Sequence, residues 1–146
     1  MAKSVIVING PNLNMLGTRE PEIYGAVTLK DIEARVRAHA QQIGLTAEFF
    51  QSNLEGEIVE AIQKAANKYD GIILNAAAYT HTSIALMDAI KATGVPTIEV
   101  HLSNVFAREP FRHHSYISPA AAGVICGFGA KGYVLAIDAL ADIFDT

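Results

Sequence analysis

Glu99 and His101 are the first residues whose types and spacing suggest chemistry, because they stand two positions apart in the segment IEVH, where they alternate with apolar residues. Side chains two positions apart on a strand leave the same face, so the carboxylate and the imidazole are expected to meet. A carboxylate beside a histidine holds one tautomer and favours the imidazolium, as a general acid requires. A glutamate and a histidine that pair only to stabilise the fold would have the same spacing. The expected position of the pair, at the ligand-binding edge of a sheet, favours the general acid.

Arg19 and Tyr24 form a second candidate pair, in the loop from residue 9 to residue 25, which shows no apolar periodicity. Connections of about 4 to 6 residues are usual in compact domains, so this longer loop is predicted to be a lid or a binding loop. A phenol with a pKa of about 10 must lose about two to three units to act as a base near neutrality. One guanidinium about 4 Å away supplies about 4 kcal/mol at an effective dielectric constant of about 20, roughly what is needed. Simple packing of the loop tyrosine is the alternative.

Strands and helices alternate strictly along the chain. The apolar runs predict strands at 5–8, 45–50, 71–75, 95–101 and 123–127, and helical periodicity begins near Thr28, Ser52, Ser83 and Ala130. This alternation predicts an α/β fold, a flavodoxin-like doubly wound sheet of five parallel strands in the order 2-1-3-4-5, forming a single domain over residues 1–146.

Ligands of such sheets bind beyond the carboxyl ends of the strands, near the switch between strands one and three. Several polar residues follow those ends: Asn9, Asn12, Asn75, His101, Ser103 and Asn104. Amides, hydroxyls and a histidine at one edge indicate a small, oxygen-rich ligand that is uncharged or singly charged.

Other ligands of this fold suit the sequence less well. A phosphorelay receiver needs carboxylates where Asn9 and Asn75 stand, and a flavodoxin needs a phosphate loop rich in serine and threonine after the first strand. Gly127, Gly129 and Gly132 satisfy the dinucleotide pattern G-x-G-x-x-G, but no further strand follows them. We therefore interpret these glycines as structural, with nucleotide binding as an alternative.

Composition limits the partners. The net charge of −4, with scattered lysines and arginines, gives no footprint for nucleic acid, and no apolar run reaches the roughly 18 residues of a membrane span. The single cysteine, Cys126, and a start without a signal peptide predict a cytoplasmic protein. The sequence has neither a cysteine cluster nor the H-E-x-x-H spacing of zinc sites, so no metal is expected. A hydrophobic fraction of 51% predicts that copies of the chain cover part of the surface.

The sequence resembles the type II 3-dehydroquinate dehydratases over essentially its full length. The resemblance rests on NGPNLNMLGTREPEIYG at 9–25, QSNLEG at 51–56, NAAAYTHTS at 75–83, EVHLSN at 99–104, and Arg108 with Arg112. That family converts 3-dehydroquinate to 3-dehydroshikimate without a cofactor or a metal, in a reaction that serves both the shikimate pathway of aromatic amino acid biosynthesis and quinate breakdown.

The resemblance implies catalytic roles. Tyr24, activated by Arg19, would remove the proton beside the ketone, and Asn12 would stabilise the resulting enolate through a held water. His101, oriented by Glu99, would protonate the departing hydroxyl, giving overall anti elimination.

The resemblance also implies how the substrate is held and how the chain assembles. The substrate carboxylate would bind Asn75 and the backbone of Leu102 and Ser103, while the ring hydroxyls would contact His81, Asp88 and Arg112. Family members form dodecamers, as tetramers of trimers, in which Asp88 is expected to reach a neighbour's site. The main alternative is a non-catalytic flavodoxin-like module that binds a small ligand.

Overall fold

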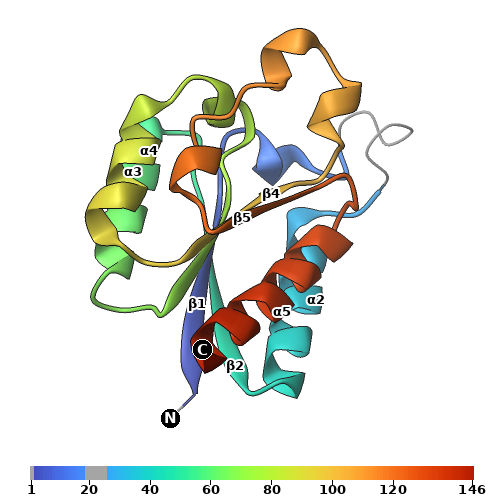
Figure 1. The fold of residues 1–146 in the computed structure, drawn as a ribbon. Coiled ribbons are helices and arrows are strands. Elements are labelled where there is room, and N and C mark those ends of the chain that lie inside the picture. Colours follow the sequence, from blue (N-terminus) through green and yellow to red (C-terminus); the bar gives the residue numbers. More distant parts are fainter. Residues whose placement is uncertain (1, 19–25) are drawn as a thin grey trace.

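One parallel sheet organises the chain in the computed structural model, which describes residues 2–18 and 26–146 (Figure 1). Its strands are β1 (Lys3–Asn9), β2 (Leu45–Gln51), β3 (Gly71–Asn75), β4 (Thr97–His101) and β5 (Gly123–Cys126). They lie in the order β2-β1-β3-β4-β5, and each neighbouring pair is parallel. The predicted strand order and flavodoxin-like topology are therefore confirmed.

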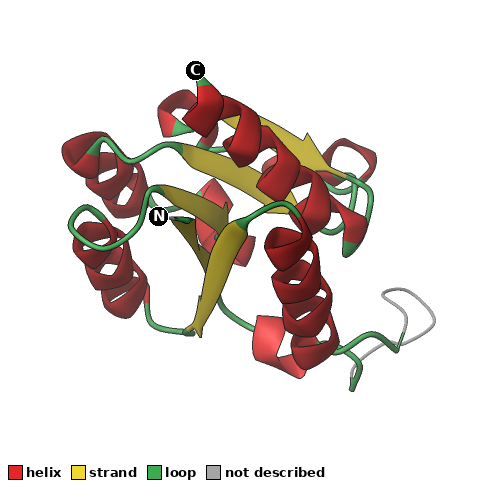
Figure 2. Cartoon of the chain, turned by 90° about the horizontal axis from the view of Figure 1, so that it is seen from below, coloured by secondary structure: helices red, strands yellow, loops and turns green. Residues whose placement is uncertain are grey.

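Helices cover both faces of this sheet (Figure 2). α2 (Leu29–Gln42) and α5 (Lys131–Asp145) pack together on one face, and α3 (Glu55–Ala65) and α4 (Ile84–Thr93) pack together on the other. The period-two alternation of the strands divides the core accordingly. In β1, Val5 and Val7 join the cluster that includes α2 and α5, whereas Ile6 and Ile8 join the cluster on the α3 and α4 side.

Some predicted boundaries shift by a few residues, and β1, for example, begins at Lys3 rather than at residue 5. α3 begins at Glu55 rather than at Ser52, because the Ser52 hydroxyl accepts the backbone N–H of Leu54 at 2.9 Å and shapes the turn that precedes the helix. β4 begins at Thr97 rather than at residue 95, because Pro96 has no N–H to donate to the strand ladder. The predicted start of α2 near Thr28 is confirmed, and Thr28 and Asp31 form a reciprocal capping box there.

The segments predicted as loops after β1, β3 and β4 contain short 3₁₀ helices. These are η1 (Leu13–Met15), η2 (Ala77–His81), η3 (Val105–Ala107), η4 (Pro110–Arg112) and η5 (Ser118–Ala120). Their hydrogen bonds span only three residues, so they leave no helical periodicity to find in the sequence. All five follow carboxyl ends of strands, and η1, η2, η3 and η4 contribute residues to the lining of the pocket described below.

The chain segments that leave β1 and β3 approach each other closely. The Gly10 N–H donates to the Asn75 carbonyl at 2.8 Å, and a Cβ on Gly10 would lie 2.6 Å from the Ala76 carbonyl oxygen. Only glycine fits this approach. The contact holds the residues after β1 beside those after β3, at the switch point of the sheet.

No helix within residues 2–18 and 26–146 combines the length and the apolar character that crossing a membrane would require.

Candidate active site

A pocket of about 260 Å³ opens at the carboxyl ends of β1, β3 and β4, where the topology predicted it. It is lined by Pro11, Asn12, Leu13, Met15, Leu16, Asn75, Ala77, Ala78, His81, His101, Leu102, Ser103, Val105, Arg108 and Arg112. Two arginines and two histidines among these residues make the pocket suitable for an anion that also carries hydroxyl groups. Carboxylates are missing from the lining that the structure describes.

The pair predicted from period-two spacing is present at the base of this pocket. Glu99 Oε2 lies 2.5 Å from His101 Nε2, and the two residues are only 1% and 6% exposed. A carboxylate accepts hydrogen bonds but cannot donate them, so Nε2 carries a hydrogen. His101 Nδ1 is then the nitrogen left to exchange a proton with a ligand in the pocket.

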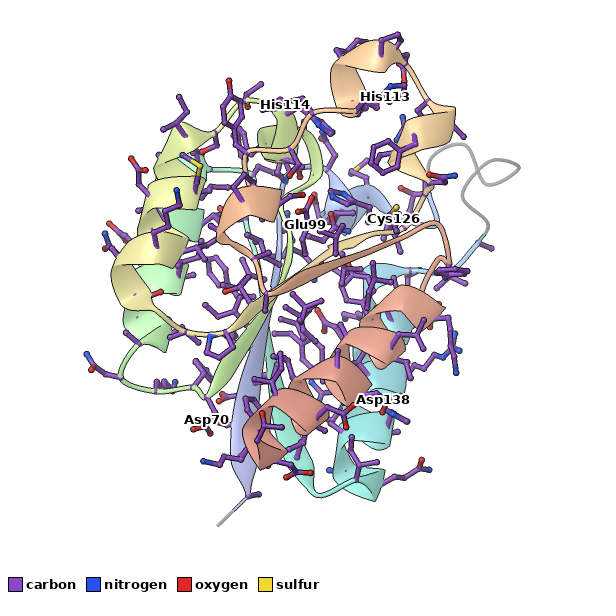
Figure 3. The ribbon with its side chains drawn as sticks, viewed as in Figure 1. Asp70, Glu99, His113, His114, Cys126 and Asp138 are labelled. Carbon is purple, nitrogen blue, oxygen red and sulfur yellow. The ribbon has the colours of Figure 1, made fainter. Side chains whose placement is uncertain are left out.

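Ser115 and Ser118 complete the surroundings of Glu99, a role that was not predicted. Their hydroxyls donate to the Glu99 carboxylate at 2.9 Å and 2.6 Å. Figure 3 shows Glu99 inside the molecule, with His113 and His114 farther out on the segment that leads to these serines. A hydroxyl-rich segment after a strand with a buried carboxylate is the signal that could have identified them.

Glu99 is ionised despite its burial. Burial raises the pKa of its carboxyl, but the hydrogen bonds from His101, Ser118 and Ser115 and the charge of His101 outweigh this, and the pKa is lowered. The site thus holds a carboxylate that stabilises positive charge on His101.

The lowered pKa of Glu99 predicts a loss of stability in acid. A carboxyl whose pKa is lower in the folded state contributes stability above its unfolded pKa and loses it as the pH falls through the folded value, at about 1.4 kcal/mol per pKa unit. Thermal melts from pH 7 to pH 3 should therefore show a shallower decline in Tm for Glu99→Gln than for the wild type. Glu60→Gln, which changes an exposed glutamate, is the control and should follow the wild type. A parallel decline in the Glu99→Gln and wild-type proteins would contradict this prediction.

His81 faces the same pocket as His101. Its Nδ1 lies 2.8 Å from the His114 carbonyl oxygen, which can only accept, so Nδ1 carries a hydrogen. Its ring stacks near that of His101, with centroids 6.4 Å apart and planes inclined by 18°. In the neutral imidazole, Nε2 is then free to accept a hydrogen bond from a ligand hydroxyl.

Asn12 and Asn75 line the pocket from adjacent strand ends. Asn12 adopts the left-handed conformation at φ 70°, and its backbone N–H donates to Asn53 Oδ1 at 3.0 Å. The Asn75 Oδ1 accepts the Ala77 N–H at 3.1 Å, which leaves Nδ2 as the donor end of this side chain.

The segment after β4 supplies groups suited to a carboxylate. Leu102 and Ser103 line the pocket, and within the described part of the chain their backbone N–H groups make no hydrogen bond. Arg112 donates to Glu109 at 2.9 Å, and Arg108 donates to the Ser103 hydroxyl at 3.3 Å. Arg108 was part of the sequence resemblance, but it had been given no role.

One of the predicted site residues that the structure describes lies away from the pocket. Asp88 is exposed on α4 and does not line it. Arg19 and Tyr24 lie outside the described residues, so their predicted pairing stays a prediction.

The glycines of the G-x-G-x-x-G pattern and the possible metal ligands are the remaining candidates. Gly132 faces Val100 and Ile125 at the start of α5, while Gly127 and Gly129 have positive φ angles of 98° and 58°. Within the residues that the structure describes, no cluster of three or more histidine, cysteine or acidic side chains could hold a metal ion.

Comparisons with known proteins identify relatives that match nearly the whole chain. The model of the family described as "Dehydroquinase class II" matches residues 3–141. A 3-dehydroquinate dehydratase of Azorhizobium caulinodans is 65% identical over 141 residues, which are 97% of this chain and 95% of that protein. A protein named catabolic 3-dehydroquinase 1, from Aspergillus terreus, is 58% identical over 97% of this chain and 93% of its own length.

Solved structures agree with these sequence matches. A type II dehydroquinase from Butyrivibrio crossotus matches with a TM-score of 0.93 and 44% identity, covering 96% of this chain and 98% of that one. A 3-dehydroquinate dehydratase-like protein from Bifidobacterium longum matches with a TM-score of 0.75 and 31% identity, covering 99% of each chain.

Proposed function

The chain belongs to the class II dehydroquinase family, and from this membership we propose how its pocket dehydrates 3-dehydroquinate to 3-dehydroshikimate. The observation that carries the proposal is the buried Glu99–His101 pair at the base of a pocket lined by Arg108 and Arg112. The pair supplies an acid for a leaving hydroxyl, and the arginines favour an anionic substrate.

Binding places the substrate carboxylate against Asn75 Nδ2 and the backbone N–H groups of Leu102 and Ser103. These donors suit an oxygen anion, as oriented amides do in other anion sites. His81 and Arg112 contact the ring hydroxyls, and Asp88 of a neighbouring copy completes the set.

Elimination then proceeds in two proton transfers. Tyr24, held as a phenolate by Arg19, takes the proton from the carbon beside the ketone, and Asn12 stabilises the enolate through a held water. As the enolate collapses to the conjugated enone, the carbon–oxygen bond breaks, and His101 Nδ1 gives its proton to the hydroxyl, which leaves as water. The proton on Tyr24 must return to His101 before the next turnover. Closure of the loop that carries Arg19 and Tyr24 would exclude water from these transfers.

We further propose that this single catalytic domain assembles as a dodecamer of four trimers in the cytoplasm. The side chains of Phe106, Phe111 and Phe128 are 62%, 64% and 64% exposed in the isolated chain, and contact with other copies would cover such apolar surface. Asp88, outside its own pocket, would then serve a neighbour. Light scattering of the purified chain should give a mass near twelve subunits, and a monomer would contradict this assembly.

The activity itself is tested by mixing the purified chain with 3-dehydroquinate and following the ultraviolet absorbance of the conjugated enone. We expect rapid product formation that is unchanged by a chelator and unaffected by borohydride, because the proposed steps use neither a metal nor a Schiff base. Saturable binding of the substrate without turnover would instead support the small-ligand-binding module. Inactivation by borohydride with substrate would indicate a lysine Schiff base.

A further inference from the structure

Tyr133 of α5 connects the helix layer to the ends of two central strands. Its side chain is fully buried, and its hydroxyl lies 2.6 Å from Asn9 Oδ1 and 2.9 Å from Asn75 Nδ2. Asn9 and Asn75 are paired in register as the last residues of β1 and β3. One hydroxyl therefore bridges the switch point of the sheet directly behind the pocket.

The direction of every hydrogen bond in this group follows from one backbone donor. The Ala77 N–H requires an acceptor, so the Asn75 oxygen must face it, and Nδ2 must face Tyr133. The Tyr133 oxygen thus accepts from Asn75 and gives its own proton to Asn9 Oδ1. One of the two Nδ2 hydrogens of Asn75 remains for the pocket.

The Tyr133 hydroxyl can donate to Asn9 and accept from Asn75 at any working pH. Burial raises the pKa of Tyr133 far above the ordinary tyrosine range, and the hydrogen bond from Asn75 offsets this only in part. A neutral hydroxyl always has a proton for Asn9 and a lone pair for Asn75.

We propose that Tyr133 is a positioning residue that, together with the Ala77 N–H, holds Asn75 with its Nδ2 toward the substrate carboxylate as a hydrogen-bond donor. This inference rests on the proposed function, because it takes Asn75 as a group that binds the carboxylate. With the amide reversed, Asn75 would turn its carbonyl oxygen toward that anion, and the contact would become repulsive. The hydroxyl of Tyr133 therefore contributes to selection of an anionic substrate without touching it.

Tyr133→Phe tests the proposal because it removes one oxygen and keeps the ring that packs in the core. We expect KM for 3-dehydroquinate to rise about 3- to 10-fold, the range that one lost hydrogen bond gives. We expect kcat to change by less than about twofold, because Tyr133 does not contact the atoms involved in proton transfer. The equilibrium affinity for 3-dehydroshikimate, which keeps the carboxylate, should fall by the same factor as the substrate affinity.

Thr97→Val is the matched control. The Thr97 hydroxyl is equally buried and donates to the Val95 carbonyl at 3.0 Å, but it lies at the opposite end of β4 from the pocket. Its loss should lower Tm and leave KM unchanged. An equal rise of KM in Thr97→Val would show a general effect of core damage and overturn the proposal.

Two more variants keep the result decisive. Asn9→Ala removes the oxygen that accepts the Tyr133 hydroxyl proton. It also removes a buried Nδ2 that has no hydrogen-bond partner in the described part of the chain, so the variant should fold. We expect it to raise KM less than Tyr133→Phe does. Asn75→Asp places a carboxylate against the substrate anion and should raise KM strongly. A wild-type KM in both Tyr133→Phe and Asn9→Ala would overturn the positioning role alone. A wild-type KM in Asn75→Asp would overturn the proposed carboxylate site as well.

Discussion

His101→Ala is expected to lower kcat by about two to four orders of magnitude, the usual contribution of a positioned general acid. The His101 side chain lies at the base of the pocket, and its Nε2 hydrogen is committed to Glu99, which leaves Nδ1 for the departing hydroxyl. Without that proton, the hydroxyl must leave as hydroxide. Steady-state kinetics at saturating 3-dehydroquinate measures the loss.

A second measurement separates the two steps of the reaction. Because His101 acts after the proton beside the ketone has been removed, the His101→Ala protein should still exchange that hydrogen with deuterium from the solvent. His39→Ala is the matched control: His39 also pairs with a carboxylate, Asp138, at 2.7 Å, but it lies on α2. It should turn over like the wild type. Retained turnover in His101→Ala, or loss of exchange together with turnover, would reject His101 as the acid of the second step.

The order of the elements could be predicted because burial on both faces imposes a simple pattern. β3, with the sequence GIILN, is buried along its whole length, and such a run between two helical periods has few other structural interpretations. The exact starts of α3 and β4 could not be predicted as reliably. They depend on the Ser52 hydroxyl, which accepts the Leu54 N–H, and on Pro96, which has no N–H. Both effects move the start of an element by a few residues without changing the apolar pattern that predicts it.

The residues of the site also differ in whether the sequence could predict them. Glu99 and His101 could be predicted to meet because a strand fixes the direction of both side chains. Ser115, Ser118 and Tyr133 could not be assigned, since they reach the site from segments that are 14 or more residues from its strand residues in the sequence. Their partners are set by the way α5 and the segment after β4 fold back onto the sheet. Without the known family motifs, no local spacing would have indicated Arg108 or Arg112 either.

Tyr24→Phe is expected to reduce kcat by several orders of magnitude with the fold intact, because it removes the base that begins the reaction. Tyr24 lies outside the described residues, and the prediction depends on its sequence position five residues after Arg19. The described lining of the pocket supports it indirectly. It offers no carboxylate as a base, and His101 is committed to the later proton transfer.

His81 is the described group that could replace Tyr24 as the base, since its Nε2 can be unprotonated and faces no partner in the described residues. The two assignments give opposite results in an exchange experiment. If Tyr24 is the base, Tyr24→Phe should lose both turnover and exchange of the substrate hydrogen, whereas His81→Gln should keep the exchange and mainly raise KM. If His81 is the base, His81→Gln should lose both turnover and exchange, whereas Tyr24→Phe should keep the exchange. Because exchange reports only proton removal, it identifies the base even where a variant also weakens the later protonation by His101.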